Sequence, residues 1–245
     1  MNVIFVSNSP VVLDKELGKK IDSFDIVIRC NDFEIDGYEK YVGTKTDIWA
    51  SCSGPPWLKD HPLMRISHWM DFQKDKLGPF KEVWTVREQK SDDLFQDNKE
   101  QLKNFVKGNT VYRYMHKKKI DGKLQYVSKF VADQVNKLKP ATSGKVSPST
   151  GFLTILTALE QFGEITVYGN SFFKDKQSMT AKQSRSSRLG KHYFTMDISK
   201  YKGTPRQKYF ETQIKREKGG YAILDYDTET KIVESFIKSG RVKLL

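Results

Sequence analysis

Short runs of β-branched and aromatic residues recur along the chain, separated by polar or helix-forming stretches. Such runs are typical of buried strands. Strands that alternate with helices usually form a mainly parallel sheet with helices on both faces. The pattern therefore predicts an α/β fold, a single Rossmann-like domain with a parallel-rich central sheet. The expected strands are Val3–Ser7, Asp25–Arg29, Asp47–Ala50, Glu82–Val86, Thr110–Tyr114 and Ile165–Tyr168.

Apolar residues recur at helical spacing in the later part of the chain. Leucine, valine and phenylalanine recur three and four residues apart, with Lys and Asp between them, before the sixth strand. Ser149 and Thr150 are residue types that begin helices, and Gly163 is a residue type that ends them. The expected helices cover Leu124–Leu138, Phe152–Phe162 and Lys231–Lys238.

Neither a repeat nor a linker divides the 245 residues, so one domain over residues 1–245 is predicted. The stretch Lys174–Lys191 is rich in Lys, Arg, Ser and Gln and lacks apolar periodicity. Long segments of this kind form surface loops, and in an enzyme they often close over the site. We therefore expect a mobile lid around residues 174–191.

Composition adds a strong positive charge to this picture. The formal net charge is +12 and the mean hydropathy is −0.60, with 38% hydrophobic residues. A basic, water-soluble protein attracts anions, which include nucleic acids, phosphate-bearing substrates, acidic polysaccharides and membrane surfaces. Charge alone does not choose among these partners.

The start of the chain and the small number of cysteines indicate the cellular compartment of the protein. The first residues run directly into an apolar strand, without the basic region and long apolar stretch of an export signal. Cys30 and Cys52 are the two cysteines, which is typical of a reduced intracellular protein. A cytoplasmic location is predicted, with peripheral contact to the inner face of a membrane left open.

Polar residues follow the first two expected strands. Asn8 and Ser9 end the first strand and Asn31 ends the second, so both amides fall at the carboxyl edge where open α/β sheets bind ligands. Amides both donate and accept hydrogen bonds, which suits a pyrimidine or a ribose. The glycine-rich loops of ordinary NAD and ATP sites do not occur in the sequence. An alternative role for Asn8 is a simple turn that ends the strand.

Three stretches resemble the motifs of one enzyme family. The stretch VSNSPVVLDKELGKKIDSFDIVIRCNDFEIDGYEKYVGTKTDIW is similar to the large sialylmotif of the sialyltransferases. PSTGFLTILTALEQFGEITVYGNSFF is similar to their small sialylmotif. His192 and Asp197, with four residues between them, resemble the very small sialylmotif, in which Glu is usual at the second position. These stretches cover about a third of the chain, in the family's order.

The resemblance implies a GT-A-like variant of the Rossmann-like fold and transfer of sialic acid from CMP-sialic acid to a glycan hydroxyl. The reaction would be inverting and independent of metal ions, so no cofactor is expected. His192 takes the family's role as general base, and histidine suits it because it titrates near neutral pH. Asp197 would support that segment. The implied contacts to the donor nucleotide are Asn8, Ser9, Asn31, Ser149, Thr150, Gly151 and Gly169.

The chain departs from the family's pattern in two further respects. The small-motif stretch contains no cysteine, so the disulfide of the secreted members cannot form. In addition, no histidine lies between Tyr168 and His192, where animal members hold the donor phosphate. The groups that could replace this histidine are Lys174, Arg185, Arg188 and the hydroxyl of Tyr193.

Alternatives to this interpretation concern the metal, the sugar and the class of protein. Asp225 and Asp227 follow an apolar run, as in metal-dependent glycosyltransferases, although a turn that caps a following helix explains them as well. The transferred sugar could be another CMP-linked acid such as Kdo. A basic nucleic-acid-binding domain is the alternative from another class. The acceptor, for which an acidic or lipid-linked glycan is one candidate, is not defined by these patterns.

Overall fold

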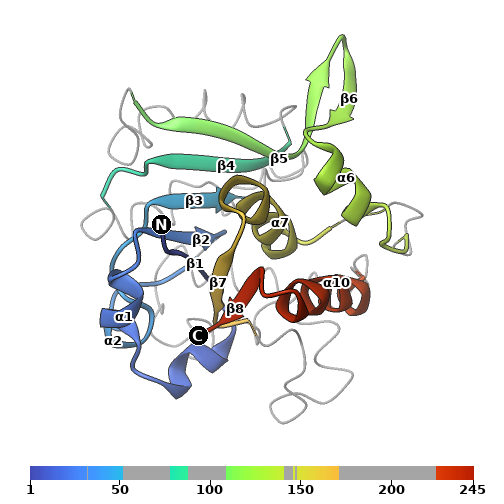
Figure 1. The fold of residues 1–245 in the computed structure, drawn as a ribbon. Helices are drawn as coiled ribbons and strands as arrows, with labels where there is room; N and C mark the ends of the chain where they lie inside the picture. The colour runs from blue at the N-terminus through green and yellow to red at the C-terminus, as the bar shows by residue number, and fades with distance from the viewer. Residues whose placement is uncertain (32, 52–77, 88–108, 141–145, 147, 171–224) are drawn as a thin grey trace, which may run out of the picture.

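The computed structural model describes residues 1–31, 33–51, 78–87, 109–140, 146, 148–170 and 225–245. These residues form one eight-stranded sheet in the order β6-β5-β4-β3-β2-β1-β7-β8 (Figure 1). All neighbouring strands are parallel except β5 and β6, which are antiparallel. The strands are β1 Val3–Val6, β2 Ile26–Cys30, β3 Ile48–Ser51, β4 Glu82–Arg87, β5 Val111–Ile120, β6 Lys123–Tyr126, β7 Ile165–Tyr168 and β8 Val242–Leu244. The predicted parallel-rich α/β sheet and its six strands are confirmed.

Helices cover both faces of this sheet, which explains why its central strands are apolar throughout. In β1, Val3 and Phe5 pack with α6, α7 and α10 on one face. Ile4 and Val6 pack with η1, α1 and α2 on the other face. Burying each of these side chains stabilises the fold by about 1.5–3 kcal/mol. The helices are η1 Pro10–Asp14, α1 Gly18–Asp22, α2 Glu39–Val42, α6 Lys129–Val135, α7 Thr150–Phe162 and α10 Tyr226–Lys238.

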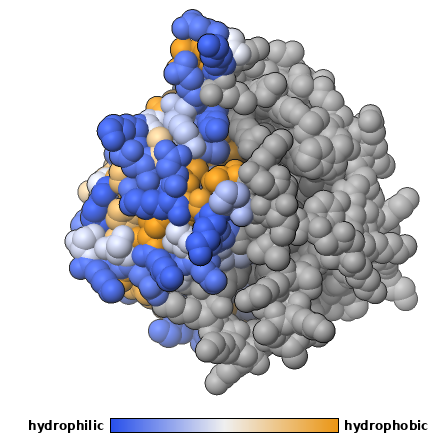
Figure 2. Space-filling model, turned by 90° about the vertical axis from the view of Figure 1, so that its right-hand side faces the viewer, coloured by the Kyte–Doolittle hydropathy of each residue, from blue (hydrophilic) through white to orange (hydrophobic). Residues whose placement is uncertain are grey.

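The helix predicted over Leu124–Leu138 is wrong in its first part. Strand β5 continues to Ile120, and the turn at Asp121 and Gly122 returns the chain as β6. Both turn residues have positive φ, 49° and 78°, which matches the twist of a tight hairpin. The helix begins only after Ser128, whose hydroxyl caps it. The β5–β6 hairpin extends beyond the sheet (Figure 1), and Figure 2 shows it as a mainly hydrophilic projection.

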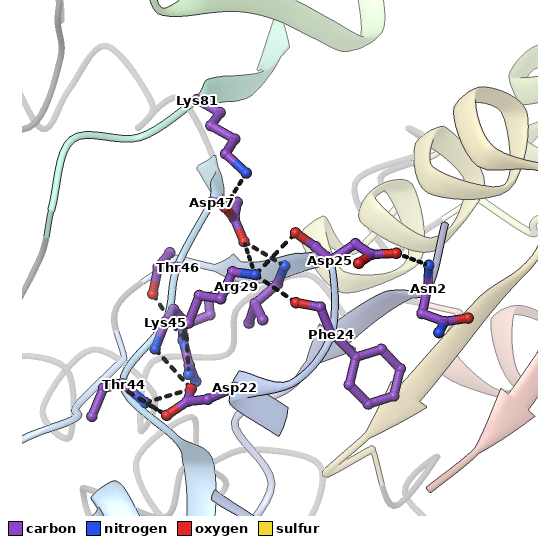
Figure 3. Close-up of polar contacts among 11 residues, drawn as sticks. Asn2, Asp22, Phe24, Asp25, Arg29, Thr44, Lys45, Thr46, Asp47 and Lys81 are labelled. Atoms are coloured by element: carbon purple, nitrogen blue, oxygen red, sulfur yellow. Dashed lines mark hydrogen bonds and ion pairs between the residues drawn. The ribbon is translucent and has the colours of Figure 1, made fainter. Parts of the chain in front are cut away.

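A polar cluster joins β2 to the loop that leads into β3 (Figure 3). The buried guanidinium of Arg29 donates to the carbonyl oxygens of Val42 and Lys45, at 2.6 and 3.1 Å, and to the hydroxyl of Thr46. The buried carboxylate of Asp47 accepts the Val27 N–H at 2.9 Å. These residues of the large motif therefore build the fold.

Glycines allow close packing in the same region. A Cβ on Gly18 would lie 1.9 Å from a backbone oxygen of α2. Gly43 has a φ of +72°, and a Cβ there would lie 2.4 Å from Asp22, whose carboxylate accepts the N–H groups of Thr44 and Lys45. Helices α1 and α2 can pack this closely only with glycine at both positions.

Among the described residues, none of the helices combines the length and the apolar content needed to cross a membrane.

Candidate functional site

The strand order places a topological switch point between β1 and β7. From β1 the chain moves to β2, β3, β4 and β5 on one side, and it later returns to form β7 and β8 on the other. In open α/β sheets, ligands bind outside the carboxyl ends of the strands at such a point. The residues that follow β1, β2 and β7 lie at this edge. The first turn of α7 lies there as well, because α7 runs antiparallel to β7.

Asn8 and Ser9 follow β1 and tie it to its two neighbours. The buried side chain of Asn8 donates from Nδ2 to the carbonyl oxygen of Cys30, at 3.0 Å, which joins the ends of β1 and β2. The backbone N–H of Ser9 donates to the carbonyl oxygen of Gly169, at 3.1 Å, which joins β1 to the end of β7. Ser9 precedes η1, but its side chain makes no capping hydrogen bond there. The turn after β1 is therefore held by both neighbouring strands.

Gly169 occupies a position that other residues cannot fill without strain. Its φ is +69°, and an added Cβ would lie 2.1 Å from Cγ1 of Val12 and 3.0 Å from the carbonyl oxygen of Ser7. The glycine thus allows the end of β7 to lie directly against the turn after β1. This is a structural reason for the glycine, in addition to the predicted contact with the donor.

Replacing Gly169 by alanine should destabilise the fold by about 2–4 kcal/mol, because strain from the positive φ adds to the crowding of Val12. Gly240 is a matched control, since its φ is +76° but nothing lies within 4 Å of its Cβ position. Gly240→Ala should cost only about 1 kcal/mol. Urea denaturation measures both values, and equal losses would contradict the close packing at Gly169.

Asn31 ends β2 in a left-handed conformation with a φ of 52°. Its N–H donates to the carbonyl oxygen of Ala50, at 2.7 Å, and its own carbonyl accepts the indole N–H of Trp49, at 3.0 Å. Asparagine tolerates this conformation better than most residues. Asn8 and Asn31 therefore follow adjacent parallel strands at one edge, as the sequence predicts.

The first turn of α7 contributes Ser149, Thr150 and Gly151. The Ser149 hydroxyl accepts the N–H of Phe152, at 3.1 Å, so the predicted N-cap is confirmed. The N–H groups of the first helical residues have no partner within a helix, and the helix dipole favours negative charge beside them. Gly151 has only one neighbour within 4 Å of its Cβ position, the ring of Phe5 at 4.0 Å. Packing by the described residues therefore does not require glycine at this position.

A buried carboxylate that the sequence analysis did not single out lies beside Ser149. Oε1 of Glu229 accepts the Ser149 N–H and Oε2 accepts its hydroxyl proton, both at 2.6 Å. Desolvation raises the pKa of Glu229 to about 7, against the lowering effect of the Ser149 hydrogen bonds, and Asp225 raises it further. The signal in the sequence was the spacing of Glu229 with Ile232, Val233 and Phe236, which places it on the buried face of α10.

This carboxylate should make stability depend on pH. The pKa of Glu229 rises from 4.5 to about 7 on folding, so the folded protein binds more protons than the unfolded chain between these values. Its contribution to stability is therefore full below pH 4.5 and is lost as the pH rises through 7. Glu229→Gln removes this dependence. The stability of the wild type relative to Glu229→Gln should fall by roughly 3 kcal/mol between pH 4 and 8. A difference that urea denaturation finds independent of pH would contradict the shift.

Asp225 caps α10. Its Oδ1 accepts the N–H of Thr228, at 3.3 Å, and its Oδ2 accepts the N–H of Lys139, at 2.7 Å. Partial desolvation acts to raise the pKa of Asp225, but these hydrogen bonds outweigh it and the pKa is lowered. Both carboxylate oxygens are thus used by backbone N–H groups. This arrangement favours the capping interpretation over the metal-binding one.

Several predicted site residues lie outside the described residues, and their roles stay predictions. They are His192, Tyr193, Asp197 and the lid around residues 174–191, with the candidate phosphate-binding groups Lys174, Arg185 and Arg188.

Comparison with known proteins finds a family model that matches most of the chain. A family model described as glycosyltransferase family 29 (sialyltransferase) matches residues 3–240. A CMP-N-acetylneuraminate-beta-1,4-galactoside alpha-2,3-sialyltransferase of Rattus norvegicus is 49% identical over 45 residues, which are 18% of this chain and 12% of that protein. A type 2 lactosamine alpha-2,3-sialyltransferase of Homo sapiens is 44% identical over 43 residues, 18% of this chain and 13% of that protein. The matches thus span about an eighth of these relatives.

Solved structures share the fold. A mammalian sialyltransferase in complex with Gal-beta-1-3GalNAc-ortho-nitrophenol has a TM-score of 0.50 and 16% identity, and the similarity covers 100% of this chain and 68% of that chain. The sialyltransferase CstII of Campylobacter jejuni, as a variant in complex with CMP, has a TM-score of 0.51 and 13% identity, covering 99% and 79%. At these identities the similarity concerns the fold alone, and it supports the predicted GT-A-like architecture.

Proposed function

The chain belongs to glycosyltransferase family 29, the sialyltransferases, and from this premise we propose that it transfers sialic acid from CMP-sialic acid to a hydroxyl group of a glycan. The observation that carries the proposal is the family match over residues 3–240. The positions of the motif residues support it. Ser9, Asn31 and Gly169 follow strands at the edge of the sheet that contains the switch point, and Gly151 lies in the first turn of α7 at the same edge. Family membership also favours a transferase over a nucleic-acid-binding domain.

The first turn of α7 is the proposed site for the nucleotide phosphate. Its N–H groups and helix dipole stabilise an anion without a metal ion. Gly151 supports this proposal, because glycine in a helix is less stable than alanine by about 0.5–1 kcal/mol and no contact among the described residues requires it. A ligand that approaches the backbone closely explains a glycine at such a position.

Gly151→Ala tests this site directly. The variant should unfold at a higher urea concentration than the wild type, because alanine favours the helix by about 0.5–1 kcal/mol. It should bind CMP about tenfold more weakly, which corresponds to ~1.4 kcal/mol, because the new methyl group stands where the ligand approaches. Titration calorimetry with CMP measures the affinity. Unchanged affinity in the stabilised variant would place the phosphate elsewhere.

For the reaction we propose an inverting displacement. The acceptor oxygen forms a bond to the anomeric carbon while the bond from that carbon to the CMP phosphate oxygen breaks. His192 takes the proton of the acceptor hydroxyl, and CMP leaves with the electron pair of the broken bond. Protein hydrogen-bond donors stabilise the phosphate charge, so the reaction needs no metal ion. The engagement of both Asp225 oxygens by backbone N–H groups supports this part of the proposal.

The decisive experiment measures release of CMP from CMP-sialic acid and from CMP-Kdo in parallel, each with and without EDTA. We expect release from CMP-sialic acid that EDTA does not reduce. Release from CMP-Kdo alone would support the alternative donor, and loss with EDTA that Mn²⁺ restores would contradict metal independence. Salt-sensitive binding of arbitrary DNA, without release from either donor, would support the nucleic-acid-binding alternative.

The acceptor and the location are also proposals. The net charge of +12 supports an acidic or lipid-linked glycan, because basic proteins attract anionic surfaces. The presence of only two cysteines supports action in the reducing cytoplasm.

A further inference from the structure

The β5–β6 hairpin concentrates positive charge at its tip, which consists of residues 117–123. The lysines of the tip are Lys117, Lys118, Lys119 and Lys123. Its one acidic residue is Asp121, in the turn. Strand β5 is paired with β4 as far as Lys117, opposite Arg87, and residues 118–120 are paired with β6. The tip therefore continues past the end of β4 as a two-stranded ribbon (Figure 1).

Side chains at the tip are exposed to solvent. Ile120 is 42% exposed, and Lys123, its partner in the ribbon, is exposed as well. Partners in an antiparallel pair lie on the same face, so an apolar group and a positive charge lie side by side there. The ammonium group of Lys117 lies 4.6 Å from the centre of the Tyr126 ring. Neither Lys117 nor Lys123 forms an ion pair with another of the described residues, which leaves their charges without a counter-ion in that part of the chain.

The stability of the fold does not account for this composition. A two-stranded ribbon on its own is at best marginally stable in water. Four lysines against one aspartate within seven residues add a net repulsion that weakens the ribbon further. An anionic partner explains a projecting element that carries such a charge.

The tip projects from the edge of the sheet that contains the switch point. Strands β1 to β5 are parallel, and the tip continues β5 beyond its pairing with β4. The carboxyl ends of these strands lie at one edge, which is also where Asn8 and Asn31 follow β1 and β2. A surface that binds the tip therefore lies on the same side of the molecule as the proposed donor site.

The chemistry of the tip selects among anionic partners. Its cations are all lysines, which act as hydrated point charges, whereas the rigid fork of arginine is preferred for nucleic acids. Small ligands such as sugars bind in concave sites, and a projecting ribbon is convex. An exposed apolar residue beside lysines matches the interface of an anionic bilayer, where the apolar group enters the headgroup region and the cations attract acidic lipids.

We propose that the β5–β6 hairpin docks the protein on anionic lipid bilayers, with Ile120 entering the headgroup region and the lysines of the tip attracting acidic headgroups. The docking needs only the hairpin and does not rest on the proposed function. It turns the carboxyl edge of the sheet toward the bilayer. An acceptor carried on a lipid would meet the protein at this edge, a consequence that does rest on the proposed function.

Sedimentation of the full chain with vesicles tests the docking. One set of vesicles contains phosphatidylcholine alone, and the other contains phosphatidylserine as well. The wild type should bind the second set at least about tenfold more tightly, and salt should weaken this binding. Joint replacement of Lys118, Lys119 and Lys123 by glutamine should weaken it about 100-fold, because each lysine near an acidic surface strengthens binding about fivefold. Lys117 is retained because it contacts Tyr126.

The matched control removes the same charge from elements away from the tip (Figure 1). Lys19 and Lys20 on α1 and Lys238 on α10 are exposed. Their joint replacement by glutamine should change the affinity by less than about twofold, because charges beyond a Debye length from the bilayer are screened. Ile120→Thr keeps a β-branched residue and should weaken binding about 3- to 10-fold through the lost apolar contact. Urea denaturation checks that each variant is folded.

Asp121→Asn tests the docking in the opposite direction. Asp121 has a φ of 49°, which asparagine tolerates, and Asn-Gly is favoured in the same two-residue turn as Asp-Gly. The variant keeps the hairpin and removes the one negative charge of the tip. It should therefore bind the phosphatidylserine vesicles about fivefold more tightly than the wild type.

Three results would overturn the inference. Equal losses of affinity in the hairpin and control variants would show attraction by net charge alone. Unchanged binding by Ile120→Thr or by Asp121→Asn would show that the tip does not touch the bilayer. Hairpin-dependent binding of heparin or DNA, without binding of the anionic vesicles, would make a soluble polyanion the partner. The vesicle assay contains no CMP-sialic acid, so a failure to release CMP would overturn the proposed function and leave the docking to be judged by the vesicles.

Discussion

Replacing His192 by alanine is expected to reduce the transfer of sialic acid by about 10²- to 10⁴-fold, while CMP affinity stays within about threefold. A general base acts on the acceptor proton in the transition state, so its loss lowers kcat rather than donor binding. His192 is the candidate because it stands in a family-like motif with Asp197, and no other histidine follows the small motif.

The measurements are melting temperature, CMP titration and transfer rate for the wild type, His192→Ala and His61→Ala. His61 precedes the small motif, so its replacement should leave transfer unchanged. A structural histidine would behave differently, since its loss would lower the melting temperature and weaken nucleotide binding together with turnover. Near-normal transfer by folded His192→Ala protein would eliminate it as the base.

Replacing Arg29 by alanine should destabilise the fold by about 3–5 kcal/mol, a large part of the 5–15 kcal/mol typical of a domain. Arg29 is 1% exposed, and its guanidinium donates to the carbonyl oxygen of Val42 at the end of α2 and to a carbonyl oxygen and a hydroxyl of the loop before β3. Its removal leaves these acceptors without their donor in the protein interior and creates a cavity. The measurement is the urea midpoint and slope of Arg29→Ala.

Arg113→Ala is the control for this prediction. The Arg113 side chain is 41% exposed, and its Nε lies 3.3 Å from the carboxylate of Glu82, which forms a partly exposed ion pair with it. The Glu82 carboxylate also accepts hydrogen bonds from Trp84 and Gln161, so it keeps donors when Arg113 is removed. Ion pairs of this kind contribute about 0–1 kcal/mol, and the loss in Arg113→Ala should stay within that range. Similar losses in the two variants would show that the loop before β3 does not depend on Arg29.

Local sequence signals predicted the elements whose cause is local. The strand Val3–Val6 is apolar at every position because both faces of the sheet are covered, and the continuous run was visible in the sequence. Ser149 and Asp225 cap helices through hydrogen bonds to residues three positions later, which a sequence pattern can show. Gly163 ends α7 with a φ of +81°, as its position after the apolar stretch predicted.

Where two local signals competed, the predicted element was wrong. The apolar spacing from Leu124 onward favoured a helix, but the Asp121–Gly122 turn directs the chain into β6. The Asp-Gly pair is itself a hairpin signal, and backbone pairing with β5 decided between the two. Backbone pairing with a distant strand is a tertiary interaction that residue spacing does not contain.

The sequence by itself determined the α/β class, the parallel strands, the helix caps and the order of the motif residues, because periodicity, capping and turn chemistry act between neighbours along the chain. Only the tertiary structure decided which of those residues form hydrogen bonds with one another. It joined the Asn8 amide to Cys30, turned Arg29 and Asp47 into a buried cluster, and brought Glu229 within 2.6 Å of Ser149. These contacts join residues 13 to 80 positions apart, and they depend on how helices and strands pack, which a local sequence pattern does not show.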